Sequence, residues 1–124
     1  MKKNFFKLVA TLALALFATF SFSACSNQGS IDMASVSAVI DVRTPAETAD
    51  GYLEGAVIID WQGPDFATEI EKLDKAANYV IYCRSGNRAG QAIELMKTSG
   101  FTGNLTNAGG LDDAAASTGL PIVF

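Results

Sequence analysis

Histidine is missing from this sequence of 124 residues, and its absence removes a large class of chemistry. Without histidine the chain has no imidazole general base, no Cys–His or Ser–His pair and no histidine ligand for a metal ion. We expect neither a metal centre nor a cofactor. Any nucleophile in this chain must therefore be activated by backbone dipoles or by charged side chains.

Cysteine is almost as scarce, because only Cys25 and Cys83 are present. Small exported domains are often held together by several disulfides, and two cysteines cannot build such a framework. If Cys25 is modified, Cys83 is the only free thiol and no intramolecular disulfide can form. A single thiol that is kept in an oxidising compartment indicates that the thiol is used.

Basic residues are few beyond the start of the chain. Lys2, Lys3 and Lys7 account for three of the nine, whereas all 13 acidic residues lie further along. The chain that follows the N-terminal segment has a net charge of −7. Because such a surface repels polyanions, we expect no nucleic-acid partner and no membrane contact through a basic face.

The N-terminal segment has the layout of a secretory signal, with a basic start, an apolar run over residues 8–20 and small residues before a cysteine. The apolar run is shorter than the roughly 20 residues of a transmembrane helix. Phe22–Cys25 resembles the lipobox of bacterial lipoproteins, although that family usually has Leu where Phe22 stands. A retained N-terminal membrane anchor is the alternative interpretation.

From this layout we expect residues 1–24 to be a lipoprotein signal peptide that is removed, leaving Cys25 lipidated. Residues 25–30 would form a polar tether, and residues 31–124 a single domain. Several acyl chains on one cysteine anchor a protein durably. The domain would then be exported, face the periplasm or the cell exterior, and touch the bacterial membrane through its lipid anchor only.

Beyond the tether, short apolar runs alternate with segments of helical periodicity. The runs predict strands over residues 36–42, 56–59, 78–83 and 103–106, and the second run is typical of a buried parallel strand. Helices are expected over residues 44–50, 65–77, 89–99 and 111–118. Thr44 and Glu47 have the spacing of a capping box. This alternation predicts an α/β domain with a mostly parallel sheet.

The segment Val80–Gly90 contains the most informative residues. A strand delivers Cys83 to its carboxyl end, a loop with Gly86 follows, and a helix begins beyond it. Ligands of open α/β sheets bind at this edge. Backbone N–H groups of such a loop form a nest for an anion, and with Arg84 and Arg88 they favour thiolate over thiol. A lone cysteine at a strand end is more often a small buried hydrophobe, but such a residue gains nothing from neighbouring guanidinium groups.

Four motifs in this order resemble the rhodanese sulfurtransferases. Residues 83–88, Cys-Arg-Ser-Gly-Asn-Arg, are similar to the six-residue active loop of that family. Residues 40–47 resemble its D-V-R-x-x-x-E motif, and residues 50–56 resemble its G-H-I-x-G-A motif. Residues 107–111 are similar to the closing pair of glycines before the last helix.

The resemblance implies a rhodanese-like three-layer sandwich, in which a central, mostly parallel sheet of about five strands is flanked by helices. It also implies a thiosulfate sulfurtransferase. The Cys83 thiolate would take a sulfane sulfur from thiosulfate or a similar small anionic donor, and the resulting persulfide would pass it to cyanide or a thiol. The donor would be bound by the loop residues Arg84, Ser85, Gly86, Asn87 and Arg88.

Within this scheme the three arginines are expected to act differently. Arg84 would steer and bind the anionic donor, whereas Arg88 would brace the loop from the helix start. Arg43 is expected to form a structural ion pair with Asp41 or Glu47 rather than to contact substrate. Trp61 is assigned no role.

Two positions depart from the family, since Tyr52 stands where histidine is common and no tryptophan follows the closing glycines. Two other functions are alternatives. Phosphatases and arsenate reductases also place a cysteine in an anion nest, but their C-x5-R spacing is one residue longer than that from Cys83 to Arg88, and the shorter ring is too tight for phosphate. The other alternative is a non-catalytic binding or persulfide-carrier module that presents the fold to a partner.

Overall fold

The computed structural model describes residues 30–124. The predicted signal peptide and the lipidation of Cys25 therefore lie outside the described residues. The elements, in chain order, are a 3-10 helix over Met33–Ser35, β1 (Ala38–Asp41), α2 (Pro45–Ala49), β2 (Tyr52–Leu53), β3 (Val57–Ile58), α3 (Phe66–Ile70), β4 (Tyr79–Tyr82), α4 (Asn87–Thr98), β5 (Leu105–Asn107), α5 (Leu111–Thr118) and β6 (Ile122–Val123). Across this part of the chain, no helix is both long enough and apolar enough to cross a membrane.

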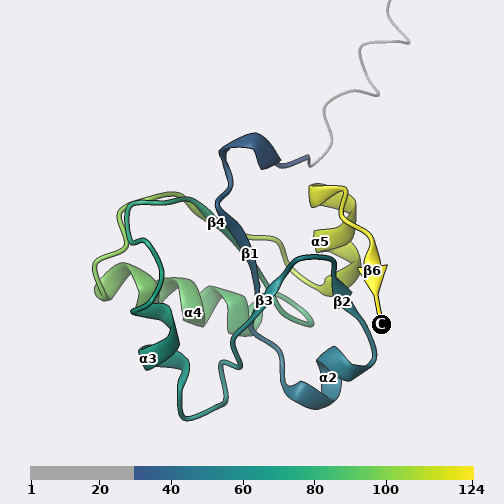
Figure 1. Ribbon diagram of the computed structural model, residues 1–124, viewed down its shortest axis with the longest axis horizontal. Coiled ribbons are helices and arrows are strands. Elements are labelled where there is room, and N and C mark those ends of the chain that lie inside the picture. The colour runs from purple at the N-terminus through teal and green to yellow at the C-terminus, as the bar shows by residue number, and fades with distance from the viewer. Residues whose placement is uncertain (1–29) are drawn as a thin grey trace, which may run out of the picture.

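The central sheet has four strands in the order β3-β1-β4-β5, and all of its pairings are parallel (Figure 1). β1 and β4 lie in the middle and pair along their whole length, from Ala38 opposite Tyr79 to Asp41 opposite Tyr82. The chain therefore leaves both strands at the same edge of the sheet. At this edge the start of α2, which follows β1, meets the loop that follows β4.

Side chains of β4 alternate between two cores, because successive residues of a strand point to opposite faces of the sheet. Tyr79, Ile81 and Cys83 belong to a cluster that contains side chains of α3 and α4. Val80 and Tyr82 belong to a second cluster with residues of β2 and α5. Helices thus cover both faces of the sheet (Figure 1), which confirms the predicted α/β fold with a central parallel sheet flanked by helices.

A second, two-stranded sheet was not predicted from the sequence. β2 and β6 pair antiparallel, with Tyr52 opposite Val123 and Leu53 opposite Ile122. The Leu53 N–H donates to the Tyr82 hydroxyl at 3.0 Å, which fastens the small sheet to β4. Two-residue strands have too little periodicity to be recognised in a sequence. The central sheet has four strands, where the resemblance implied about five.

The strand predicted over residues 56–59 is present as β3, but the prediction that this strand is buried was wrong. β3 lies at the edge of the sheet, and its side chains Val57 and Ile58 are 39% and 44% exposed. Only Ile59, which follows the strand, is buried. A short apolar run indicates a strand without showing which of its residues are covered.

The helix expected over residues 65–77 is also shorter in the structure, since α3 ends at Ile70. The chain turns at Asp74, whose carboxylate accepts the Ala76 N–H at 3.0 Å and whose carbonyl accepts the Tyr79 hydroxyl at 2.8 Å. An aspartate that bonds the nearby backbone competes with helix formation. The predicted capping box of α2 is present, because the side chains of Thr44 and Glu47 each accept the other residue's backbone N–H.

Candidate active site

The loop that contains the predicted nucleophile, here called the nucleophile loop, begins at Cys83, directly after β4, and ends where α4 starts at Asn87. Gly86 is the N-cap of α4 and has φ +95° and ψ −12°. This left-handed conformation favours glycine, because a Cβ atom would be strained there. A Cβ on Gly86 would also lie 3.3 Å from the Cα of Gly109. The turn at Gly86 directs the backbone N–H groups of the loop toward Cys83.

The Cys83 side chain is fully buried inside this loop. The Gly86 N–H donates to Cys83 Sγ at 2.9 Å. Burial is the largest single influence on the pKa of the Cys83 thiol and raises it. Hydrogen bonds from the backbone N–H groups of Ala89, Ser85, Gly86 and Arg88 outweigh burial, so that the pKa lies below its ordinary value. The loop thus stabilises a thiolate without any general base.

Arg88, in the first turn of α4, forms a bidentate ion pair with Glu47 of α2. Its Nη1 and Nη2 atoms lie 2.7 Å and 2.9 Å from the two carboxylate oxygens. The hydrogen bond from Arg88 is the main reason that the pKa of Glu47 falls to about 2. The same carboxylate accepts the backbone N–H of Thr44 in the capping box at 3.4 Å. Arg88 is therefore held against α2, on the flank of the loop.

Arg43 is almost fully buried and pairs with Asp41, which is one of the two partners expected from the sequence. Its Nη2 lies 2.8 Å from Asp41 Oδ2 and donates to the Gly51 carbonyl at 2.6 Å. Its guanidinium carbon lies 5.7 Å from the centroid of the Tyr82 ring. Burial lowers the pKa of Arg43, but the hydrogen bond and charge of Asp41 reverse this effect and raise it. Arg43 thus links β1 to the turn before β2.

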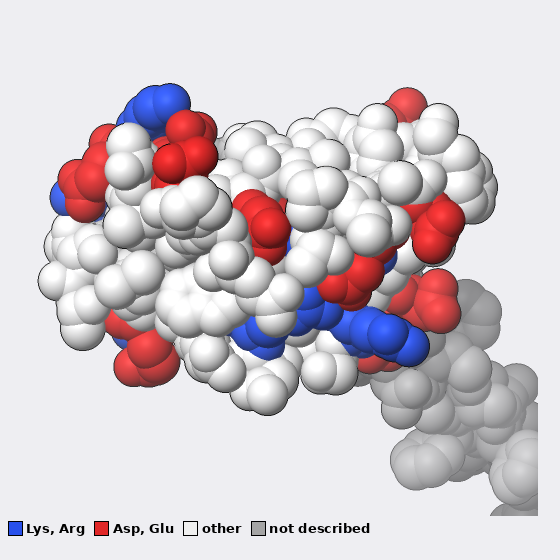
Figure 2. All heavy atoms as spheres, turned by 90° about the horizontal axis from the view of Figure 1, so that it is seen from below, with Lys and Arg blue, Asp and Glu red and all other residues white. Residues whose placement is uncertain are grey.

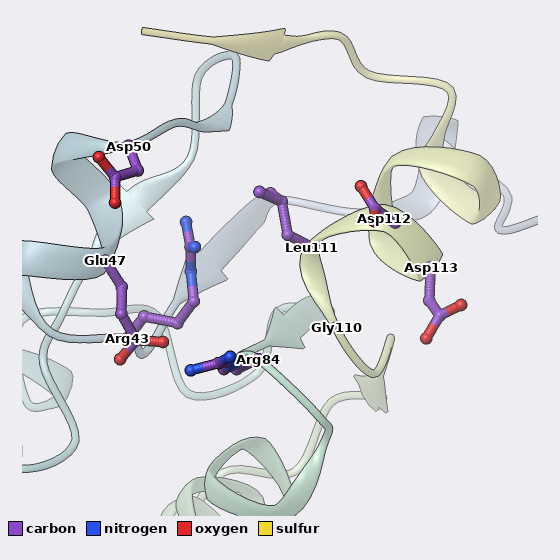
Figure 3. Close-up of a pocket in the computed structure, with 8 residues that line it drawn as sticks. All are labelled: Arg43, Glu47, Asp50, Arg84, Gly110, Leu111, Asp112 and Asp113. Carbon is purple, nitrogen blue, oxygen red and sulfur yellow. The ribbon is translucent and has the colours of Figure 1, made fainter.

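Arg84 is exposed and forms no ion pair with any residue between 30 and 124. It lies at an open pocket of about 600 Å³ next to the loop. In the close-up the Arg84 side chain points into this pocket beside Arg43 and Glu47 (Figure 3). The residues that line it are Arg43, Glu47, Asp50, Arg84, Gly110, Leu111, Asp112 and Asp113. Cys83 is not one of them.

The pocket has carboxylates as well as guanidinium groups. Asp112 and Asp113 come from the first turn of α5, and Asp50 ends α2; none of the three has an ion-pair partner among the described residues. In the space-filling view, Lys and Arg atoms in the lower middle of the face are bordered by Asp and Glu atoms (Figure 2). These acidic residues could not be assigned to a pocket from the sequence, because nothing in the local pattern marks them beyond a position in or next to the family motifs.

The segment after β5 closes the nucleophile loop on its other side. The Cys83 N–H donates to the Gly109 carbonyl at 2.9 Å. A Cβ on Gly110 would lie 2.4 Å from the Arg84 carbonyl oxygen, so this close approach requires glycine. The two closing glycines therefore let two backbone segments pack directly against each other. Over residues 30–124, no three side chains that commonly ligate metals come together.

A family model described as "Rhodanese-like domain" matches residues 26–117. The chain belongs to the rhodanese-like domain family. The match includes β1, the nucleophile loop and the closing glycines, so the family resemblance read from the motifs is confirmed. The match begins within the predicted tether, before the domain predicted over residues 31–124, and ends before the last residues of that domain.

Curated relatives of this rhodanese-like domain are named as sulfurtransferases. Thiosulfate sulfurtransferase PspE of Escherichia coli is 34% identical over 76 residues, which cover 61% of this chain and 72% of that protein. A sulfurtransferase of Allochromatium vinosum is 36% identical over 85 residues, which cover 68% of this chain and 77% of that protein.

Solved structures give the same fold. A structure described as "rhodanese with anions from E. coli" is 33% identical, has a TM-score of 0.56, and is matched over 69% of this chain and 95% of its own. The Rhodanese_3 like domain of the Alr3790 protein from Anabaena is 25% identical, with a TM-score of 0.60 over 70% of this chain and 98% of its own.

Proposed function

We propose that this protein is a sulfurtransferase that carries a sulfane sulfur on Cys83 as a persulfide. The observation that supports this function most directly is the set of backbone N–H groups around Cys83 Sγ, of which Gly86 donates at 2.9 Å. These groups lower the pKa of the thiol despite its burial. A thiolate is the form of cysteine that attacks sulfur, so the loop raises the fraction of Cys83 that is present as the nucleophile.

The proposed reaction has two steps, neither of which needs a proton donor. The Cys83 thiolate attacks the sulfane sulfur of thiosulfate or a similar donor, a new S–S bond forms, and the old S–S bond breaks with its electron pair leaving on sulfite. Cyanide or a thiolate then attacks the outer sulfur, and the Cys83 thiolate is the leaving group. The loop N–H groups stabilise the sulfur anion present before and after each step.

Substrate reaches the sulfur by way of the pocket that Arg84 lines. Cys83 has no exposed surface in the structure and does not line this pocket, so a donor contacts its sulfur only after the groups that cover it move. Arg84 is exposed and has no ion-pair partner in the described part of the chain, which makes it the group that binds the anionic donor. The name of the Escherichia coli relative supports thiosulfate as the donor.

The function is tested by the mass of the purified protein after mixing with thiosulfate. We expect a gain of one sulfur atom that peptide mapping places on Cys83, and cyanide should remove the gain and release thiocyanate. Cys83→Ser should show neither step. If Cys83 stays unmodified under thiosulfate yet alkylates readily, the sulfurtransferase proposal is wrong, and a non-catalytic binding module becomes the better interpretation.

The same proposal places the protein outside the cytoplasm, lipid-anchored through Cys25. It is supported by the sequence alone: a basic start, an apolar run over residues 8–20 and the lipobox-like Phe22–Cys25. An exported sulfur carrier of this kind would act on small anionic sulfur compounds in the periplasm or at the cell exterior.

A further inference from the structure

Asn107 lies beside the nucleophile loop, although it is 24 residues from Cys83 in the sequence. It is the last residue of β5 and is opposite Ile81 of β4. Because β4 and β5 are parallel neighbours, the carboxyl end of β5 lies next to the loop that follows β4. The Asn107 residue is exposed, so its amide is not part of the hydrophobic core.

The Asn107 side chain closes a ring of four hydrogen bonds that includes the nucleophile. Its Nδ2 donates to the Gly86 carbonyl at 2.8 Å, and its Oδ1 accepts the Gly109 N–H at 3.0 Å. Gly86 donates to Cys83 Sγ at 2.9 Å, and Cys83 donates its own N–H to the Gly109 carbonyl at 2.9 Å. Both the donor and the acceptor of this one amide are thus used to join the two backbone segments that enclose the sulfur.

Gly86 is the residue of the loop whose conformation depends most on hydrogen bonds from other segments. Its left-handed φ of +95° lies in a region where glycine has wide freedom, so the residue does not fix its own conformation. Its carbonyl accepts from Asn107 and also from the Gly90 N–H at 3.0 Å, which begins α4. With its carbonyl held from two sides, Gly86 keeps its own N–H directed at Cys83 Sγ, and α4 begins in the orientation that presents the Arg88 and Ala89 N–H groups to the sulfur.

We propose that Asn107 is a positioning residue, which holds the N–H groups of the nucleophile loop in the arrangement that receives the sulfur anion at Cys83. Its relevance to turnover rests on the proposed sulfurtransferase function, whereas its effect on the thiol does not. Asn107 touches neither the reacting sulfur nor the pocket, so it acts through Gly86 and Gly109.

The charged groups around the nucleophile loop and the segment that closes it come from several elements, and an Asn107→Ala change leaves all of them in place. They are Arg84 in the loop, Arg88 on α4 with its partner Glu47 on α2, Asp60 after β3, and Asp113 on α5. A change in thiol reactivity in this variant therefore reports the geometry of the loop rather than a changed charge. Asn107→Asp keeps the acceptor for Gly109 but replaces the donor by a carboxylate that faces the Gly86 carbonyl.

The experiment measures the rate of Cys83 alkylation by iodoacetamide against pH, with no sulfur compound present. For Asn107→Ala we expect the midpoint of the pH profile to move upward and the rate at pH 7 to fall about tenfold, because the thiolate loses aligned hydrogen bonds. Asn107→Asp should move the midpoint further in the same direction. Thermal unfolding of both variants checks that they are folded, and the exposed position favours that outcome.

Asn104→Ala is the matched control, since Asn104 is also exposed, lies just before β5 and donates no side-chain hydrogen bond in the structure. It should alkylate like the unchanged protein. If folded Asn107→Ala and Asn107→Asp keep the unchanged pH profile, the positioning role is wrong. If the profile shifts but the unchanged protein takes no sulfur from thiosulfate, the positioning role stands and the sulfurtransferase proposal fails.

When sulfur transfer is present, turnover gives a second readout. Asn107→Ala should lower kcat for thiosulfate and cyanide by about tenfold, with a smaller effect on the KM for thiosulfate, because Arg84 and the pocket are intact. An unchanged kcat with a raised KM would show that Asn107 contributes to donor binding and would overturn the positioning role.

Discussion

Three arginines surround the nucleophile loop, and the partner of each one limits what it can do. Arg43 and Arg88 are neutralised by Asp41 and Glu47, with closest N–O distances of 2.8 Å and 2.7 Å. Arg84 has no such partner among the described residues. Only Arg84 therefore has a full positive charge to offer to an anionic substrate.

This difference predicts different kinetics for two arginine substitutions. Arg84→Ala should raise the apparent KM for thiosulfate more than it lowers kcat, and added salt should shrink the effect because the side chain is exposed. Arg88→Ala should lower kcat or the free energy of unfolding, since it releases the loop from α2. Steady-state kinetics at two salt concentrations distinguish the two. If the two substitutions change KM and kcat equally and independently of salt, the assignment of donor binding to Arg84 and of loop bracing to Arg88 is wrong.

The Glu47 carboxylate should make the stability of the protein depend on acid. Its pKa falls from 4.5 to about 2 on folding. Between these values the unfolded state binds more protons than the folded state, so the stabilisation is complete above about pH 5 and is lost as the pH falls toward 2. Glu47→Gln should therefore lower the free energy of unfolding by about 1–2 kcal/mol at pH 7 and by less at pH 3.

Urea unfolding at the two pH values measures this difference. Glu69→Gln is the control, because Glu69 pairs with Lys72 on the surface and its side chain is 42% exposed. That pair should contribute under about 0.5 kcal/mol. A cost for Glu47→Gln that is the same at pH 7 and pH 3 would contradict the coupling to Arg88.

Partners of charged residues could be predicted from the sequence only when they were close along the chain. The pair of Arg43 with Asp41, two residues away, was among the expected alternatives. The pair of Arg88 with Glu47 joins residues 41 positions apart, and nothing in the local sequence identifies it. It exists because β1 and β4 are parallel neighbours, a fact of sheet order that periodicity does not reveal.

At the scale of elements, the length of the nucleophile loop should decide its chemistry. The loop encloses one sulfur atom with the N–H groups of Ser85, Gly86, Arg88 and Ala89. Inserting one glycine after Gly86 should abolish sulfur transfer, because the N–H groups no longer converge on Cys83 Sγ. The unchanged protein should not hydrolyse aryl phosphates. Assays for thiocyanate and for p-nitrophenol on both proteins test this, and measurable phosphatase turnover by the unchanged protein would overturn the assignment.

Elements with strong local signals were the ones that could be predicted. β4 was expected from its run of β-branched and aromatic residues, and α2 from its capping box, and both are present. The two-residue strands β2 and β6 were missed, because their pairing depends on the chain returning to Leu53 from Ile122. The order of strand, glycine-containing loop and helix around Cys83 could be predicted from the sequence. The roles of the individual loop residues stay predictions.

At the scale of the whole molecule, the segment before residue 30 should determine where the domain is found. If residues 1–24 are a lipoprotein signal, the protein should fractionate with membranes, and Cys25→Ala should release it or block its processing. Fractionation followed by mass determination of the N-terminus tests both outcomes. Wild-type protein found soluble in the cytoplasm with Met1 intact would show that the export prediction is wrong.

The single carboxylate of Glu47 also joins two parts of the molecule that would otherwise open separately. It accepts the Thr44 N–H at the start of α2 and both guanidinium nitrogens of Arg88 at the start of α4. Fraying of the first turn of α2 therefore breaks the contact at Arg88 and loosens one flank of the nucleophile loop, which Asn107 and Gly109 still bind from the other side. Amide hydrogen exchange over residues 45–49 should accordingly be coupled to exchange over residues 85–89, so that opening of a five-residue helix elsewhere in the chain raises the exchange of the loop around Cys83.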